Sequence, residues 1–128
     1  MGNPPASASD PVVLVVEDDT IVRMMAVATL ADAGFTVLEA EHADSALAVL
    51  RARATDIHAL FTDVRMPGNM DGIMLAHETK RCWPWIGLLI TSGYTPYGRA
   101  AMPSGSRFLQ KPYEPGQVAQ HVRELLAA

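Results

Sequence analysis

The sequence predicts an α/β fold in which a five-stranded parallel sheet carries helices on both faces. Short apolar runs alternate along the chain with segments long enough for helices, and this alternation is typical of parallel strands joined by crossover helices. The first run, residues 12–16, is apolar at every position, as expected for a strand that is buried on both faces. Several runs also end in polar residues, which places those residues at one edge of the predicted sheet.

Length, composition and charge are those of one compact domain. The chain has 128 residues, of which 49% are hydrophobic and 19% are charged, so it can bury a core. Its formal net charge is -4 and it has no block of Lys and Arg, which argues against direct binding of nucleic acid. No stretch approaches the ~20 apolar residues of a membrane span, and none resembles a signal segment. The single cysteine, Cys82, fits a reducing, cytoplasmic setting.

The elements are expected in a regular order along the chain. Residues 1–10 lack an apolar period and are predicted to form a disordered tail, which leaves residues 11–128 for the domain. Further strands are predicted at residues 35–40, 58–62, 86–90 and 107–110. Helices are predicted at residues 21–33, from 44 or 45 to 53, at 71–82 and from Pro115 onward.

The first helix is expected to begin after a cap at Asp19 or Thr20 and to end at Gly34. Its sheet-facing side chains are expected to be apolar residues at helical spacing. They are Ile21, Met24, Met25 and Ala28, with Leu30 as a further candidate.

Polar side chains follow four of the predicted strands. The carboxyl ends of parallel strands meet at one edge of the sheet, where open α/β folds bind their ligands. An acidic cluster, a hydroxyl and an ammonium group would therefore converge there. In chain order these residues are Glu17, Asp18, Asp63, Thr91, Ser92 and Lys111.

The chemistry that uses this set is phosphoryl transfer to a carboxylate. Asp63 would be the nucleophile and would form an acyl phosphate. Oxygen ligands from Asp18 and Asp63, with Glu17 acting through water, suit Mg2+. The Ser92 hydroxyl and the Lys111 ammonium could each bind a phosphoryl oxygen. The glycine at position 93 would let the backbone approach closely.

Four motifs give the chain a family resemblance. They are VVLVVEDD, FTDVRMPG followed by Asp71-Gly72, ITSG and FLQKP. With these motifs the sequence resembles the response-regulator receiver domain of two-component signalling, over about residues 11–126. The resemblance implies a flavodoxin-like sheet with strand order 2-1-3-4-5. It also implies a bacterial, cytoplasmic phosphoprotein.

The resemblance assigns roles to individual residues. Asp63 matches the phosphoacceptor, and Glu17 and Asp18 match the acid pair, with Asp18 as the direct metal ligand. The main-chain carbonyl of Arg65 matches a further metal ligand. Lys111 matches the lysine of the family motif, and its peptide bond to Pro112 would be cis.

The same resemblance implies a switch formed by a hydroxyl and an aromatic ring. Ser92 is preferred to Thr91 as the switch hydroxyl, because a small residue, Gly93, follows it directly. Phe108 stands where the family has a rotating aromatic side chain, often Tyr.

Two features depart from the family pattern. Residues 93–106 contain Pro96, Gly98, Pro103 and Gly105, so the fourth helix of the family is predicted to be shortened or replaced by loop, with at most one helical turn near residues 98–102. This change affects the usual output and dimer surface, so a homodimer is left open. Arg65 places a long cation beside the phosphoryl site, where it is either solvated or sets the acyl-phosphate lifetime.

A stand-alone receiver is expected, because no output domain follows in the 128 residues; it would signal by protein contact or pass phosphate on in a relay. It is not expected to be an enzyme, since only its own phosphorylation and slow self-dephosphorylation are expected. Its partners would be a sensor histidine kinase or a histidine phosphotransfer protein, and an unknown downstream protein that it contacts directly. A phosphohydrolase that uses an aspartyl phosphate is disfavoured, because Arg65 stands where such enzymes need a second Asp. A degenerate receiver that binds partners without phosphate is disfavoured by the complete set of site residues.

Overall fold

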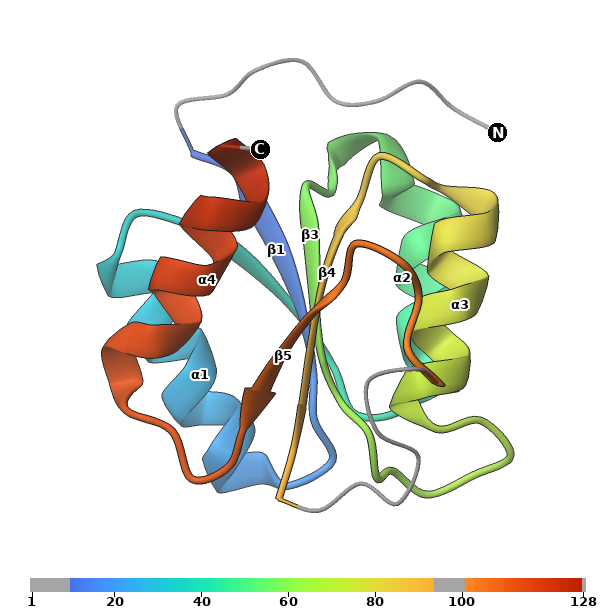
Figure 1. The fold of residues 1–128 in the computed structure, drawn as a ribbon, viewed down its shortest axis with the longest axis horizontal. Coiled ribbons are helices and arrows are strands. Elements are labelled where there is room, and N and C mark those ends of the chain that lie inside the picture. Colours follow the sequence, from blue (N-terminus) through green and yellow to red (C-terminus); the bar gives the residue numbers. More distant parts are fainter. Residues whose placement is uncertain (1–9, 94–100, 128) are drawn as a thin grey trace.

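The structure is a computed structural model that describes residues 10–93 and 101–127 and places a parallel sheet between two layers of helices (Figure 1). The strands are β1 (Val12–Val16), β2 (Thr36–Ala40), β3 (Ala59–Asp63), β4 (Gly87–Ser92) and β5 (Arg107–Gln110). The helices are α1 (Thr20–Asp32), α2 (Ala43–Arg53), α3 (Gly72–Cys82) and α4 (Pro115–Ala127), with a short 3-10 helix at Ala54–Asp56.

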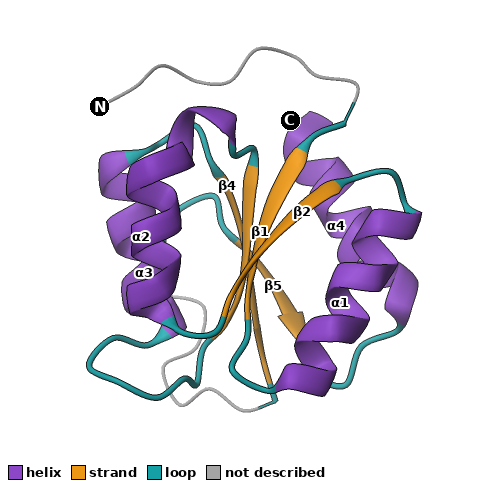
Figure 2. Cartoon of the chain, turned by 180° about the vertical axis from the view of Figure 1, so that it is seen from behind, coloured by secondary structure: helices purple, strands orange, loops and turns teal. Residues whose placement is uncertain are grey.

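The sheet has the order β2-β1-β3-β4-β5 with every neighbouring pair parallel. Figure 2 shows α1 and α4 together on one face and α2 and α3 on the other. The predicted doubly wound, flavodoxin-like fold and its strand order are therefore confirmed. Within the part of the chain that is described, no helix is both long and apolar enough to cross a membrane.

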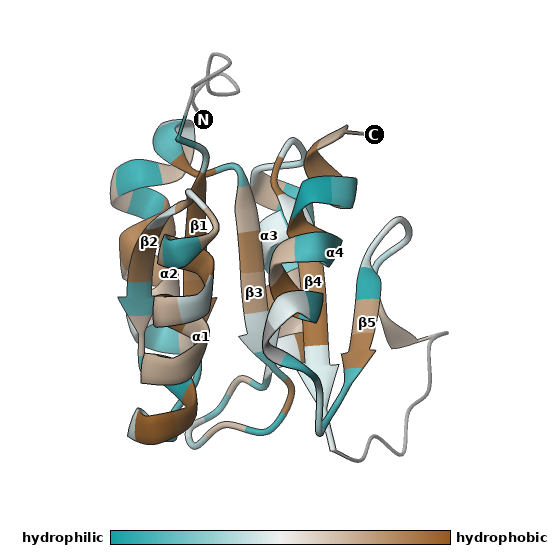
Figure 3. Ribbon diagram, turned by 90° about the vertical axis from the view of Figure 1, so that its left-hand side faces the viewer, coloured by the Kyte–Doolittle hydropathy of each residue, from teal (hydrophilic) through white to brown (hydrophobic). Residues whose placement is uncertain are grey.

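The core lies on both faces of the central strands, because side chains of a strand alternate between faces. Leu14 and Leu60 pack toward α2 and α3, whereas Val13 and Phe61 pack toward α1 and α4. All five residues of β3 are buried. Figure 3 shows this pattern as hydrophobic residues along β1, β3 and β4 and hydrophilic residues on the visible side of α4.

The helices α1, α2 and α3 begin at side-chain caps, two of which are aspartates. Asp19 accepts a hydrogen bond from the Val22 amide at 3.0 Å and starts α1, and Asp71 starts α3 in the same way. At the start of α2, the Nδ1 atom of His42 accepts from the Ser45 amide while the Ser45 hydroxyl accepts from the His42 amide. The helix predicted to begin at residue 44 or 45 thus begins at Ala43, one residue after an unpredicted histidine cap.

The predicted inner face of α1 is wrong for four of its five residues. Ile21, Met24 and Met25 are 65%, 59% and 61% exposed, and Ala28 is exposed as well. Of the candidates, only Leu30 is buried. The residues that face the sheet are instead Arg23, Ala26 and Leu30, which lie at helical spacing. An arginine can occupy this face because its donors are bound to oxygen atoms at the ends of two strands.

The expected helical turn near residues 98–102 falls largely on residues 94–100, which lie outside the described part of the chain. The described remainder, residues 101–106, contains no α-helix and packs against α3. Met102 in this segment is buried in the core. The His77 Nε2 atom lies 2.7 Å from the carbonyl oxygen of Ala101, and Lys80 Nζ donates to the carbonyl oxygen of Ser104 at 2.7 Å.

Candidate functional site

The polar residues predicted to converge do so at the carboxyl edge of the sheet. Asp63 is the last residue of β3, and Glu17 and Asp18 follow β1 directly. Thr91 of β4 is the register partner of Asp63, and Lys111 follows β5. Four parallel strands therefore bring acidic residues, residues with a hydroxyl group and a lysine to one edge of the sheet.

Three carboxylates form the centre of the site. Glu17, Asp18 and Asp63 each offer an oxygen, and these oxygens lie within 4.8 Å of one another. Glu17 and Asp63 are only 6% and 7% exposed, whereas Asp18 is open to solvent. Carboxylate oxygens at this spacing repel one another and are the donors that Mg2+ prefers, so the donor set fits this ion.

Lys111 neutralises part of this negative charge. Its Nζ atom donates to Asp63 Oδ2 at 3.2 Å and lies 3.7 Å from Glu17 Oε2. Burial opposes the charge of Lys111, but the nearby carboxylates of Asp63 and Glu17 outweigh it and raise the lysine pKa. Burial, followed by the hydrogen bond to Asp63 and its negative charge, raises the pKa of Glu17 to about 8. The cluster without a metal ion therefore retains a proton near neutral pH.

The end of β3 is fixed by close main-chain packing against the start of α3. The Gly72 amide donates to the carbonyl oxygen of Val64 at 2.8 Å, and the Thr62 hydroxyl donates to that of Asp63. A Cβ atom at position 72 would lie 1.9 Å from the Asp63 carbonyl oxygen, so only glycine fits there without a backbone shift. This role of Gly72 was not predicted from the sequence.

The two candidate hydroxyl groups have different surroundings. Thr91 Oγ1 donates to the main-chain oxygen of Leu109 and so joins β4 to β5. Ser92 ends β4, is 2% exposed, and accepts at its main-chain oxygen from the Lys111 amide at 3.0 Å. The Thr91 hydroxyl is therefore bound within the sheet, between β4 and β5.

The remaining predicted residues lie in or just after β3, β4 and β5. The Lys111–Pro112 peptide bond is cis, the form that the resemblance implies. Arg65 is exposed, and Phe108 is half-buried against the core on the α2 and α3 side. A Cβ atom on Gly93 would meet Lys111 only at an ordinary contact distance of 3.9 Å, so a close approach does not require glycine there.

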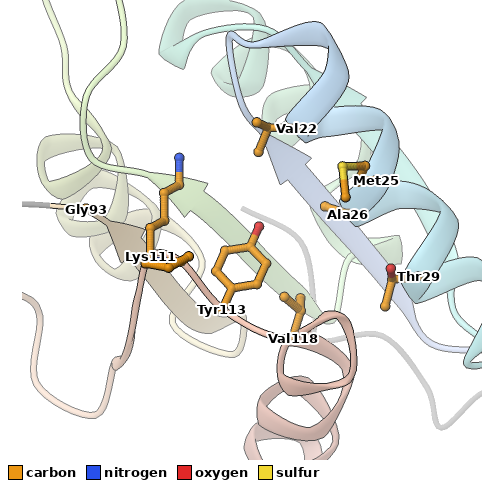
Figure 4. Close-up of a pocket in the computed structure, with 9 residues that line it drawn as sticks. Val22, Met25, Ala26, Thr29, Gly93, Lys111, Tyr113 and Val118 are labelled. Atoms are coloured by element: carbon orange, nitrogen blue, oxygen red, sulfur yellow. The ribbon is translucent and has the colours of Figure 1, made fainter.

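An apolar pocket of about 430 Å³ adjoins the site between α1 and the loop after β5 (Figure 4). Figure 4 shows the Tyr113 ring directed toward α1, opposite Val22 and Ala26. The Tyr113 ring also packs edge-on against Phe61, with centroids 6.1 Å apart. The pocket was not predicted, because the apolar residues of α1 were expected to face the sheet.

Comparison with known proteins agrees with this arrangement. The family model of the response regulator receiver domain matches residues 13–123. The chain is 36% identical over 117 residues to the sensor kinase CckA of Brucella abortus, covering 89% of this chain and 12% of that protein. It is 33% identical over 106 residues to the DNA-binding transcriptional regulator NtrC of Salmonella typhimurium, covering 80% of this chain and 22% of that protein. The chain thus spans a small part of these relatives.

Solved structures of receiver domains are also similar to this chain. A response regulator receiver protein from Sinorhizobium medicae superposes with a TM-score of 0.87 at 27% identity, covering 95% of this chain and 98% of that one. The receiver domain of the hybrid histidine kinase CckA superposes with a TM-score of 0.77 at 32% identity, covering 90% and 98%. The matched residues include the carboxylate cluster and the lysine described above. The chain therefore belongs to the response regulator receiver domain family.

Proposed function

We propose that this chain is a phosphoacceptor in two-component signalling and that Asp63 receives the phosphoryl group. The donor would be the phosphohistidine of a sensor histidine kinase or of a histidine phosphotransfer protein, in the cytoplasm. The observation that carries this proposal is the geometry at the end of β3, where buried Asp63 lies 3.2 Å from Lys111 and beside two further carboxylates. A solvated surface aspartate would have neither the burial nor the counter-ion.

In the transfer, a carboxylate oxygen of Asp63 forms a bond to phosphorus as the bond between phosphorus and the histidine nitrogen breaks. The electron pair of that bond remains on the leaving imidazole. Lys111 binds a phosphoryl oxygen as a point charge and so stabilises the acyl phosphate. Mg2+, when held by Asp18 and Asp63, with Glu17 through water and the Arg65 carbonyl, would supply positive charge that offsets the carboxylates and the phosphoryl oxygens.

Phosphorylation would then be read as a change of protein surface. The phosphoryl group adds about -1.5 to -2 charges at neutral pH. The Ser92 side chain would move inward and donate to a phosphoryl oxygen, and the Phe108 ring would fill the space that Ser92 vacates. The conformation with this altered surface near β5 would then become more populated. The reader would be an unknown downstream protein that contacts the receiver directly. We propose no turnover of a small substrate.

The test is intact mass after incubation with a small phosphodonor and Mg2+, with and without EDTA. Wild type is expected to gain one phosphoryl group only when Mg2+ is present, and Asp63→Asn is expected to gain none. Asp56→Asn is the matched control, because this aspartate is exposed in the 3-10 helix before β3, at the end of the strand away from Asp63. A folded, Mg2+-binding wild type that gains no phosphoryl group would contradict the proposal and favour a phosphate-independent binding module.

A second measurement concerns Arg65, which is exposed beside the acceptor. We propose that its side chain influences how long the acyl phosphate survives, by controlling the access of water or of a partner. The rate of phosphate loss from Arg65→Ala should then differ from that of wild type. Equal rates would remove this part of the proposal.

A further inference from the structure

Arg23 is a buried arginine that connects the acidic loop to the neighbouring strand. Its side chain is 11% exposed, and it extends from the first turns of α1. Nη1 donates to the main-chain oxygen of Glu17 at 2.8 Å. Nε donates to Glu39 Oε1 at 3.2 Å, and Nη2 lies 3.8 Å from Glu41 Oε1. A guanidinium group can reach three such partners because its donors form a rigid, planar fork.

The main chain of Glu17 is held at both of its polar groups. Its amide donates to the carbonyl oxygen of Ala40, at the end of β2, at 3.1 Å. Its carbonyl oxygen accepts from Arg23, whose outer donors face the same end of β2. Glu17 is therefore held on both sides, by the peptide group that precedes it and by the peptide group that it shares with Asp18, whose carbonyl oxygen Arg23 binds. Both carboxylates that β1 contributes to the cluster are attached to this peptide group.

We infer that Arg23 is a positioning residue for the metal-binding carboxylates, acting through the Glu17 carbonyl. The inference rests on the proposed function, because it assigns Arg23 to the same Mg2+ site. Arg23 holds the loop in the orientation that brings Glu17 and Asp18 within reach of Asp63. Without this contact, Glu17 and Asp18 would still be present but would no longer be held in the orientation that binds the metal ion.

A purely structural ion pair is a weaker account of the same contacts. The acidic partners Glu39 and Glu41 are 49% and 71% exposed, and ion pairs this open to solvent contribute little. The short contact to the Glu17 carbonyl lies at the buried end of the guanidinium. A buried cation on a main-chain oxygen restricts that peptide group directly, so the effect is expected in metal affinity as well as in stability.

The experiment measures Mg2+ binding by calorimetry and thermal unfolding without metal, using Mg2+ alone as the ligand. Arg23→Met is expected to raise the Mg2+ dissociation constant about 10-fold or more, the range seen when a residue supporting a metal ligand is removed. The dissociation constant of Arg23→Lys is expected to lie between those of Arg23→Met and wild type, because an ammonium group cannot bridge the Glu17 carbonyl and Glu39 as a guanidinium does. Arg53→Met is the control, because Arg53 is half exposed and pairs only with Asp56 among the described contacts.

The outcomes separate positioning from stability. An Arg23→Met protein that unfolds at lower temperature but binds Mg2+ as wild type does would overturn the inference. If Arg23→Met does not fold, Arg23→Lys decides: a dissociation constant raised above wild type and above Arg53→Met supports the inference, and an unchanged one overturns it. Saturating Mg2+ is expected to restore phosphorylation of Arg23→Lys. A wild type that binds Mg2+ but accepts no phosphoryl group would contradict the proposed function alone.

Discussion

The buried carboxyl group of Glu17 should make the metal-free protein less stable as the pH rises, and Glu17→Gln tests this. Burial and the adjacent Asp63 raise the pKa of Glu17 from 4.5 to about 8. Between these values the folded protein holds a proton that the unfolded chain has lost. The free energy of unfolding therefore falls as the pH rises through this window, and the loss is complete above about pH 8.

The size of the effect follows from the shift in pKa. Each unit corresponds to about 1.4 kcal/mol, so the upper limit for Glu17 is about 5 kcal/mol, less whatever the cluster recovers by relaxation. Glutamine has nearly the same shape but does not ionise. In the absence of metal, Glu17→Gln should therefore lack this loss of stability and should exceed wild type near pH 9.

The assay is urea unfolding in EDTA at several pH values, followed by the fluorescence of Trp83 and Trp85. Asp32→Asn is the control, because its carboxylate is exposed at the end of α1 and lies outside the cluster. Added Mg2+ is expected to stabilise wild type more than Glu17→Gln, since the variant lacks one carboxylate of the cluster. Parallel pH profiles for wild type and Glu17→Gln in EDTA would refute the reasoning.

Three further predictions concern packing, the switch and a helix cap. Gly72→Ala should lower the free energy of unfolding by about 1–3 kcal/mol, because its Cβ would lie 1.9 Å from the main-chain oxygen that ends β3. Gly116→Ala, with nothing within 4 Å, should be neutral or slightly stabilising in the same denaturation assay, and equal midpoints for the two variants would contradict this. Thr91→Val should reduce stability by about 1 kcal/mol yet keep the phosphorylation-induced shifts in the NMR spectrum, whereas Ser92→Ala should lose them; the opposite result would identify Thr91 as the switch. His42→Ala should reduce stability by about 0.5–2 kcal/mol, whereas His42→Asn should retain most of it, and two equally weakened proteins would argue against the cap.

The strands and the site could be predicted because they depend on short-range signals. The strands β1, β3 and β4 are mostly apolar runs that lead into polar residues, and parallel strands bring those ends together whatever the loops do. The convergence of Glu17, Asp63 and Lys111 follows from this rule alone.

The inner face of α1 could not be predicted from hydrophobicity. Met24 and Met25 are more apolar than Arg23, yet the arginine is buried and the methionines are exposed. The deciding contacts join α1 to Glu17, which follows β1, and to Glu39 of β2, and no local pattern encodes such partners. Histidine is likewise an uncommon helix cap, so the start of α2 was expected at the more usual capping residues that follow it.

The two partners of the Lys111–Asp63 ion pair lie on a central strand and beside an edge strand, which differ in how readily they open locally. Asp63 ends β3, which is buried throughout and pairs with a strand on each side. Lys111 follows β5, which has only four residues and, among the described strands, pairs with β4 alone. Local opening and amide hydrogen exchange are fastest at such edges. Asp63 thus lies on a strand that is paired on both sides, whereas Lys111 follows an edge strand that can detach more readily. A protein that binds along β5 would therefore change how long the lysine stays beside Asp63 without touching either side chain.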